Sequence, residues 1–232
     1  EFEDAIKQLK QIISRDNKNG LAYKLLGTAY GMSNHEDEAI RELTRATELL
    51  REDSEIYFNL GGVFMLKDMF ESAARCFRKV IELDPMDRLG YANLAAAYDV
   101  EKKYDEEVQV LKKILMFSPE DIELRSALST AYFNSEKYDE ALNHALCVIE
   151  LDEKDPQAYC NLGSCYSAQN MVDEAIKAFQ KASEIDPDYS LPHTNLGSLY
   201  ATVGRLEKAI KEFKLATSMN KGDALAWMNL YQ

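Results

Sequence analysis

The sequence predicts an all-α protein, a solenoid of antiparallel helix pairs that follow one another every 34 residues. The main observation is self-similarity at this period, with no insertion or deletion that breaks the register. Each copy has leucine at its seventh position, and alanine stands at the twentieth position in every copy but one. The leucines are Leu26, Leu60, Leu94, Leu128, Leu162, Leu196 and Leu230. The 10 Gly and 5 Pro of the 232 residues are also too few for a turn-rich β protein.

The period divides the sequence into six full repeats between two partial ones. The expected boundaries are 1–19 for the second helix of a preceding repeat, 20–53, 54–87, 88–121, 122–155, 156–189 and 190–223 for the six repeats, and 224–232 for the start of a further repeat or a capping helix. Both ends fall inside a repeat and the first residue is not Met, so we expect the native array to be longer.

The first helix of each repeat is predicted from positions 4, 7, 8 and 11, which share one face at 3.6 residues per turn. In the second full repeat these positions hold Tyr57, Leu60, Gly61 and Phe64. Position 8 is small in all six full repeats. A small residue lets the two helices of a pair approach closely, so that a large side chain can fill the space beside it.

The second helix is predicted from positions 17, 20, 21, 24 and 27, which again share one face. In the fifth repeat these positions hold Val172, Ala175, Ile176, Phe179 and Ala182. Position 18 is acidic in all seven copies. A carboxylate in the first turn of a helix stabilises it through the helix dipole by about 0.3–1 kcal/mol, so these acids have a structural explanation.

Composition excludes several classes of function. The net charge of −13 disfavours nucleic acid and anionic membrane surfaces as partners, because both would be repelled. No apolar run approaches the ~20 residues that span a bilayer, so membrane insertion is not expected. The four cysteines form no C-x-x-C pair and the three histidines lie far apart, so we expect no metal and no cofactor. Such cysteines favour a reducing compartment, and we expect an intracellular, cytoplasmic protein.

These repeats resemble the tetratricopeptide repeat family. The residues that carry the resemblance are Tyr57, Leu60, Gly61, Phe64, Ala73, Phe77 and Pro85 in the second repeat, and Tyr159, Leu162, Gly163, Tyr166, Ala175, Phe179 and Pro187 in the fifth. The resemblance covers the whole sequence and implies a right-handed superhelix whose concave groove is lined by the first helices. It also implies a scaffold, co-chaperone, targeting receptor or assembly factor.

In this family the groove is built mainly from positions 2, 5, 6, 9, 12 and 13. Across the six repeats, the charged residues at these positions are Lys24, Glu55, Asp99 and Glu123. We therefore expect a nearly neutral groove. Its N-terminal half is apolar, with Met32, Phe58, Met65, Leu66 and Val100, and its C-terminal half carries small hydroxyl and amide side chains. The apolar residues form a protein-binding patch or, alternatively, pack against neighbouring first helices.

Position 6 carries the most specific candidate residues for binding. It holds Asn59, Asn93, Asn161, Asn195 and Asn229, with Leu25 and Ala127 interrupting the series. Asparagine is a poor helix former, and its amide can bond a peptide C=O and N–H together. The series is similar to the asparagine ladder of O-linked N-acetylglucosamine transferase and of importin-α-type solenoids. Alternatively, asparagine is simply common at this position. The full set of candidate groove residues adds Lys24, Phe58, Met65 and Thr194.

One specialised binding mode of the family is not expected. Its chaperone-binding members grip a C-terminal carboxylate with lysine, asparagine and arginine at set positions of three repeats. Lys24 and Asn59 match that pattern, but Thr28, Leu89 and Asn93 do not. We therefore reject a carboxylate clamp.

The junction of the third and fourth repeats departs from the pattern. Glu107 replaces alanine, Arg125 replaces an aromatic residue, and Ser129 replaces glycine. A charge at a close-approach position loosens helix pairing, unless Glu107 and Arg125 pair with each other. We expect residues 100–130 to form the least stable link of the array.

The leading functional interpretation is a non-enzymatic module that binds other proteins, as an extended peptide or an amphipathic helix in the groove. One alternative is a structural module that self-associates through the ends of the array. Another is a substrate-recruiting part of a larger enzyme. Nothing in these residues suggests a nucleophile with its base or a phosphate-binding loop, so catalysis within this sequence is not expected.

Overall fold

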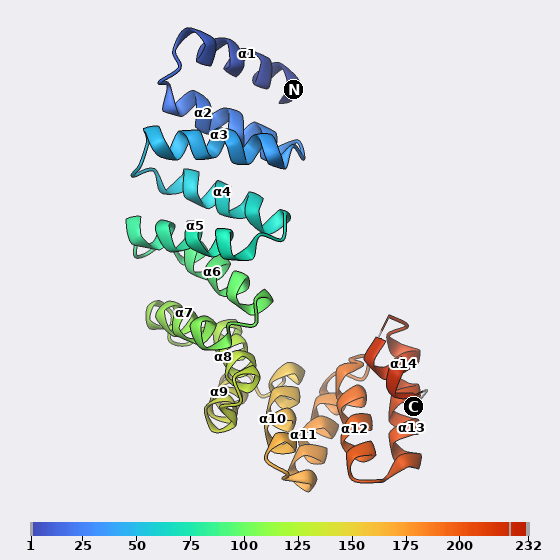
Figure 1. Ribbon diagram of the computed structural model, residues 1–232. Coiled ribbons are helices and arrows are strands. Elements are labelled where there is room, and N and C mark those ends of the chain that lie inside the picture. Colours follow the sequence, from blue (N-terminus) through green and yellow to red (C-terminus); the bar gives the residue numbers. More distant parts are fainter. Residues whose placement is uncertain (1, 223, 231–232) are drawn as a thin grey trace. The chain divides into compact units, whose positions relative to one another are not determined.

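The computed structural model describes residues 2–222 and 224–230. This part of the protein forms fourteen α-helices and no strand, which confirms the predicted all-α fold (Figure 1). The helices are α1 Phe2–Arg15, α2 Gly20–Met32, α3 Glu36–Leu49, α4 Ser54–Leu66, α5 Phe70–Leu83, α6 Arg88–Val100, α7 Tyr104–Phe117, α8 Ile122–Asn134, α9 Tyr138–Leu151, α10 Pro156–Ala168, α11 Val172–Ile185, α12 Leu191–Thr202, α13 Leu206–Met219 and α14 Ala224–Leu230. The ends of the two predicted terminal segments, at residues 1 and 231–232, and the side chain of Leu230 lie outside the described residues.

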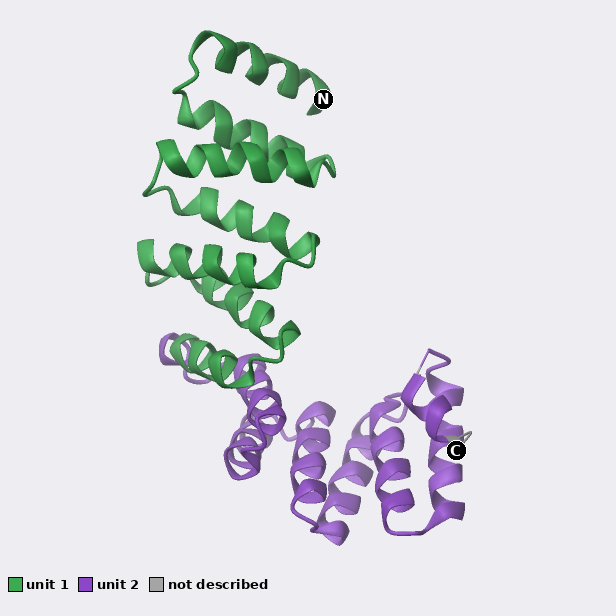
Figure 2. Cartoon of the chain, in the orientation of Figure 1, with its two compact units in different colours: residues 1–114 green, residues 115–232 purple. Residues whose placement is uncertain are grey.

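The protein divides into two compact units, unit 1 at Glu1–Ile114 and unit 2 at Leu115–Gln232 (Figure 2). In unit 1, successive helices run antiparallel, with α2 packed on α3 and α4 on α5 (Figure 1). Its core includes Leu26, Leu43 and Ile56, all buried. In unit 2, α10 packs on both α9 and α11, and α12 packs on α13. Each unit is thus a stretch of solenoid, whereas the division into repeats stays a prediction.

The two helices of a pair approach closely at position 8 of the first helix. A Cβ atom added at Gly61 would lie 2.7 Å from the Phe77 ring, and one added at Gly163 would lie 2.6 Å from the Phe179 ring. Both phenylalanines, at position 24 of the second helix, are fully buried. The expected combination of a small residue with a large neighbour is therefore confirmed, and each ring takes the place of the missing side chain.

A short acidic or amide residue precedes the first helices α2, α4, α6, α8 and α10, and the sequence interpretation overlooked it; α12 lacks such a cap. Asp53, Asp87, Asp121 and Asp155, with Asn19 in the same place, accept hydrogen bonds from backbone N–H groups of the first turn. Such an N-cap stabilises a helix by about 1 kcal/mol. The recurrence of Asn19, Asp53, Asp87, Asp121 and Asp155 every 34 residues was a visible signal for it, and Tyr189 interrupts the series.

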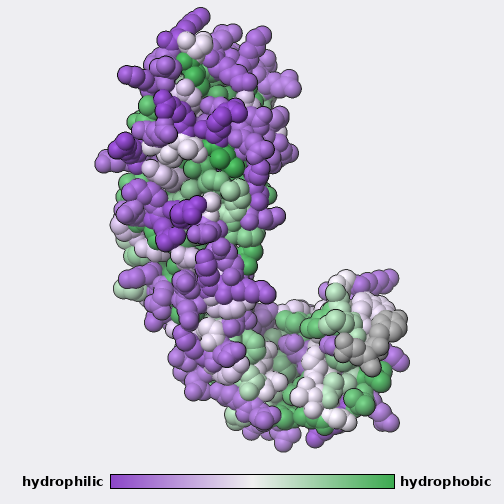
Figure 3. Space-filling model, viewed as in Figure 1, coloured by the Kyte–Doolittle hydropathy of each residue, from purple (hydrophilic) through white to green (hydrophobic). Residues whose placement is uncertain are grey.

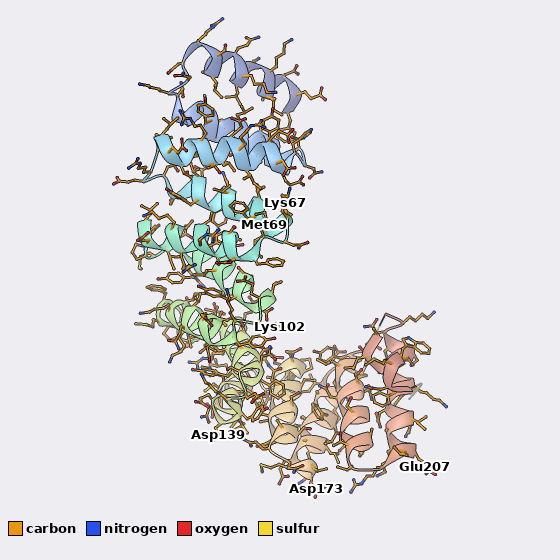
Figure 4. All side chains as sticks on the ribbon, in the orientation of Figure 1. Lys67, Met69, Lys102, Asp139, Asp173 and Glu207 are labelled. Carbon is orange, nitrogen blue, oxygen red and sulfur yellow. The ribbon has the colours of Figure 1, made fainter. Side chains whose placement is uncertain are left out.

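The turn between the two helices of a pair has the same backbone form each time. Its second residue lies in the left-handed region, with φ from 55° to 65° at Asn34, Asp68, Lys102, Glu136 and Asn170, and 76° at Gly204. The second helix then starts with the expected acidic residue in its first turn; Figure 4 labels Asp139, Asp173 and Glu207 in α9, α11 and α13. These repeated turns keep the register of the helix pairs.

Glu107 is the exception in the packing of unit 1. The other full repeats carry a buried alanine at the same position, namely Ala39, Ala73, Ala141, Ala175 and Ala209. Glu107 is only 8% exposed as well. Its Oε2 atom has no hydrogen-bond partner among the described residues. Burial, with a smaller contribution from Asp99, raises the pKa of Glu107 to about 7.

The other two departures from the repeat pattern are accommodated differently. The Arg125 guanidinium donates to the carbonyl oxygen of Pro119 from Nε at 2.9 Å, so Arg125 has a backbone partner rather than the alternative partner Glu107. The buried Ser129 hydroxyl donates to the carbonyl oxygen of Ala141 at 2.8 Å, which satisfies the polar group that replaces glycine. Of the three departures, Glu107 alone keeps an uncompensated buried atom among the described residues.

Glu107 should make stability depend on pH. An unfolded glutamate has a pKa of about 4.3, so between roughly pH 4.3 and 7 the unfolded protein releases a proton that the folded protein keeps. The free energy of unfolding should therefore fall as pH rises through this window and then level off. Glu107→Ala should remove this contribution and raise the free energy of unfolding at pH 8 by about 1–3 kcal/mol.

Urea unfolding of both proteins between pH 5 and 8 measures the effect. The exposed neighbour Glu106→Ala is the matched control and should leave the pH dependence of the wild type in place. A Glu107→Ala variant with the stability and pH dependence of the wild type would contradict this account.

Candidate functional site

A hollow of about 360 Å³ lies between the first helices α2 and α4 of unit 1. Its lining residues are Gly27, Thr28, Gly31, Met32, Leu43, Phe58, Asn59, Gly62, Val63 and Leu66. None of them is charged. Met32 and Leu66 at its mouth are 66% and 68% exposed, so these side chains do not pack into the solenoid. The expected apolar character of the N-terminal half of the groove is confirmed for this hollow.

A second hollow of about 260 Å³ lies along the first helices α10 and α12 of unit 2. Its lining residues are Phe133, Ser164, Ser167, Ala168, Phe179, Asn195, Ser198, Leu199 and Thr202. Four hydroxyl groups and one amide thus meet in this hollow, and again no lining residue is charged. This agrees with the hydroxyl and amide character expected for the C-terminal half. On the face seen in Figure 3, hydrophobic surface is exposed among hydrophilic side chains in each unit.

The two hollows occupy the same place in their repeats. Each hollow is lined by the residues at repeat positions 9, 12 and 13 of one first helix and at positions 6, 9, 10 and 13 of the next first helix. The side chain at position 24 of the second helix between them also lines it. The equivalent pairs are Thr28 and Ser164, Gly31 and Ser167, Met32 and Ala168, Leu43 and Phe179, Asn59 and Asn195, Gly62 and Ser198, Val63 and Leu199, and Leu66 and Thr202. One repeat geometry thus produces two hollows of different chemistry.

Gly62 has no packing role in unit 1. It lies inside α4, where glycine costs about 1 kcal/mol relative to alanine. A Cβ atom added at Gly62 would meet nothing within 4 Å, whereas Gly61 before it faces the Phe77 ring. The absence of a side chain at position 62 therefore widens the hollow without improving the packing of the helices.

The predicted asparagine row is not uniform in its hydrogen bonding. The Asn59 amide donates to Thr28 Oγ1 at 3.1 Å, and the Asn93 amide donates to the carbonyl oxygen of Leu89 in its own helix at 2.8 Å. Asn161 Oδ1 accepts from Gln157, and its Nδ2 is buried without a partner among the described residues. Asn195 makes no hydrogen bond to a described residue, and its polar atoms are not buried. Asn229 is half-buried on α14.

The remaining candidate residues occupy different surroundings. Phe58 lines the unit 1 hollow and packs edge-on against the Phe77 ring, whereas Met65 does not line it. Thr194 is only 1% exposed, which corrects its expected place on the groove surface. Its hydroxyl faces its own helix, 3.5 Å from the carbonyl oxygen of Ser190, so a ligand in the groove cannot contact it.

Lys24 is engaged by two carboxylates. Its Nζ lies 2.8 Å from Asp53 Oδ2 and 2.6 Å from Glu55 Oε2, and its side chain is buried. Burial alone would lower the pKa of Lys24, but the bonds to Asp53 and Glu55 outweigh it and raise the pKa above its usual value. Lys24 thus joins α2 to the start of α4, and its charge is already neutralised, which agrees with the rejection of a carboxylate clamp.

Within residues 2–222 and 224–230, no group of three or more His, Cys, Asp or Glu side chains could hold a metal ion. Burial raises the pKa of the Cys76 and Cys165 thiols to about 11 and that of Cys160 to about 12, so these thiols stay protonated. None of the described helices combines the length and the apolar character needed to cross a membrane.

Comparisons with known proteins agree with this architecture. Three sequence models described as tetratricopeptide repeat match residues 54–86, 156–189 and 178–211. The protein is similar to YrrB, described as a TPR protein with an unusual peptide-binding site, at 27% identity over 82% of the present sequence and 98% of YrrB, with a TM-score of 0.56. It is also similar to the MamA protein, at 26% identity over 75% of the present sequence and 96% of MamA, with a TM-score of 0.61.

A third solved structure shares the fold alone. It is the C-terminal part of a TPR repeat-containing protein from Cytophaga hutchinsonii, at 16% identity over 99% of the present sequence and 94% of that one, with a TM-score of 0.71. The comparison with curated protein sequences finds no match.

The two neighbouring glycines of α4 should respond oppositely to alanine. Gly62→Ala should raise the free energy of unfolding by about 1 kcal/mol, because alanine is the better helix former and its methyl group meets nothing. Gly61→Ala should lower it by about 1–3 kcal/mol, because its methyl group overlaps the Phe77 ring. Urea unfolding of the two variants measures both effects, and a destabilised Gly62→Ala protein would show that position 62 does have a packing role.

Proposed function

Because the protein belongs to the tetratricopeptide repeat family, we propose that it is a protein-interaction module that binds a peptide segment of another protein along its first helices. Each helix pair of this kind buries one face of both helices and leaves the opposite face of the first helix for a ligand. The proposal takes each 34-residue helix pair as one repeat, with the boundaries set out above.

The observation that carries this proposal is the pair of equivalent hollows. Both are open, uncharged, and placed beside an asparagine of position 6. In unit 2 the Asn195 amide can offer a donor and an acceptor to a backbone C=O and N–H of the ligand, since no described residue uses them. The description of YrrB as having a peptide-binding site supports a ligand of the same kind.

An extended peptide explains these features better than an amphipathic helix does. A helix satisfies its own backbone groups and would leave the Asn195 amide without a backbone partner. An extended segment has free C=O and N–H groups along its length, and small lining residues such as Ser164 and Ser198 let a backbone come close. We therefore assign the Asn195 amide to the backbone of the ligand and the hollows to its side chains.

Replacing the unit 2 asparagines tests this function. Asn161→Ala together with Asn195→Ala should weaken peptide binding at least about tenfold, chiefly because the lost Asn195 amide removes its hydrogen bonds to the ligand backbone. Thermal stability should stay nearly unchanged: Asn161→Ala leaves Gln157 without its acceptor but also removes a buried unpaired donor. The probes are peptides selected on the wild-type protein from a phage-displayed random library, and fluorescence polarisation measures their affinity.

Asn143→Ala, on the exposed face of α9, is the matched control and should bind as the wild type does. Unaltered affinity in the double variant would exclude the two asparagines from binding. A library that yields no peptide for the wild-type protein would contradict the proposed function itself.

Self-association is a second candidate function, favoured by one observation on α13. Leu206 and Ile210 are exposed there, whereas Val172 and Ile176, at the same positions of α11, are packed against a neighbouring buried cluster. If a second copy covers this face, sedimentation velocity should show a concentration-dependent dimer that Ile210→Lys dissociates, because a buried lysine would lack a partner. A monomer at all concentrations would exclude this candidate.

A further inference from the structure

The two hollows differ in what they can bind, and the difference lies in few residues. The floor is apolar in both, formed by Leu43 in unit 1 and Phe179 in unit 2. The walls differ: Met32, Gly62 and Leu66 in unit 1 are replaced by Ala168, Ser198 and Thr202 in unit 2. Two pockets that select different ligand side chains can share one geometry and differ only in the residues of their walls, as these two hollows do.

We propose that each hollow selects one side chain of a peptide bound along its own unit, a bulky apolar one in unit 1 and a small, uncharged, hydrogen-bonding one in unit 2. This inference rests on the proposed function and adds to it the class of peptide that the protein recognises. It makes Gly62 and Ser198, with the neighbouring wall residues, the determinants of specificity.

In unit 1 the Thr28 hydroxyl and the Asn59 amide nitrogen of the hollow are already used as donors within the protein. Asn59 donates to Thr28 Oγ1 at 3.1 Å, and the Thr28 hydroxyl donates to the carbonyl oxygen of Lys24 at 2.9 Å. No lining residue carries a charge that could neutralise a charged side chain of the ligand. A charged or strongly polar occupant would therefore lose its water without replacement, whereas an apolar one gains about 25 cal/mol per Å² that it buries.

The size of the unit 1 hollow favours a bulky side chain. Its volume of about 360 Å³ exceeds that of the unit 2 hollow, about 260 Å³, and Gly62 leaves open space where Ser198 stands in unit 2. Met32 and Leu66 can close over the occupant, since both side chains are exposed and methionine adapts its shape. A small occupant would leave part of this space unfilled.

In unit 2 the polar groups of the hollow are available. Ser164 and Ser167 make no side-chain hydrogen bond to a described residue, whereas Asn195 is assigned to the ligand backbone. The Ser198 and Thr202 hydroxyls donate to carbonyl oxygens of α12, which leaves their lone pairs as acceptors. An apolar side chain in this hollow would separate these polar groups from water, which costs about 1–3 kcal/mol for each group left unpaired. A serine, threonine or asparagine side chain of the ligand is therefore favoured.

Exchanging the wall residues tests the inference. The protein of residues 1–232 with Met32→Ala, Gly62→Ser and Leu66→Thr has the unit 2 walls in unit 1. Wild type and variant are each used to select peptides from the phage-displayed random library, and the best peptides are then substituted residue by residue. For peptides selected on the wild type, replacing the bulky apolar residue by serine should lower affinity about tenfold. The same replacement should change affinity less than about twofold on the variant.

Two further variants keep the result interpretable. Met86→Ala removes a methionine as exposed as Met32, at 66%, but outside both hollows, and should preserve the wild-type preference. The reverse exchange, Ala168→Met, Ser198→Gly and Thr202→Leu, places the unit 1 walls in unit 2. Peptides selected on this variant should show a second preference for an apolar residue, and a misfolded protein could not gain such a preference. Thermal unfolding checks that each variant is folded.

The outcomes separate this inference from the function on which it rests. If peptides bind the wild type but keep the same residue preferences on both exchanged variants, the hollows do not select side chains, although the peptide-binding function stands. If no peptide binds the wild type, the proposed function fails and this inference fails with it. If instead the unit 1 exchange abolishes a dimer seen by sedimentation, the occupant is a second copy of the protein, which also overturns the inference.

Discussion

The close approach of the two helices in each pair is the constraint on which the other features depend. At Gly61 in α4 and Gly197 in α12 there is no room for a Cβ atom, because a phenylalanine ring of the second helix fills that space. This contact fixes the rotation of the first helix about its axis. Once that rotation is fixed, positions 6, 9 and 13 of α4 and α12 face away from the core, where they line the two hollows. The packing that stabilises each pair thus also orients the surface available to a ligand.

The sequence predicts the fold well because its packing residues repeat. Leucine, glycine, aromatic and alanine columns define both helices of every pair, and the observed helices follow them. The aspartate caps repeat just as clearly and were simply overlooked. The state of each groove residue does not repeat, because it depends on neighbours from other helices. Asn59 is bonded because position 9 of the preceding first helix is Thr28, whereas nothing in the sequence reveals that Asn195 makes no such bond or that Thr194 is buried.

The strong acidic character of the protein has little to do with the hollows. Their lining residues carry no charge, and the groove cation Lys24 is held between Asp53 and Glu55. Many of the acids have structural roles instead, as N-caps of the first helices or in the first turns of the second helices. The acidic residues of this protein therefore contribute mainly to helix stability, and the residues that line the hollows for recognition are neutral.

Substitutions have different consequences at the repeat positions that pack between helices, here called packing columns, and at those that line the hollows, here called recognition columns. A charge in a packing column, such as Glu107, leaves a buried atom unpaired and raises its pKa, so the cost falls on the fold. Replacement in a recognition column costs little, because the side chains at the mouth of a hollow, such as Leu66 and Thr202, are exposed. The same scaffold can therefore present an apolar hollow in one unit and a hydroxyl-lined one in the other. Since each hollow is built from two neighbouring first helices, its chemistry is set locally, and specificity can differ along the array while the helix packing stays the same.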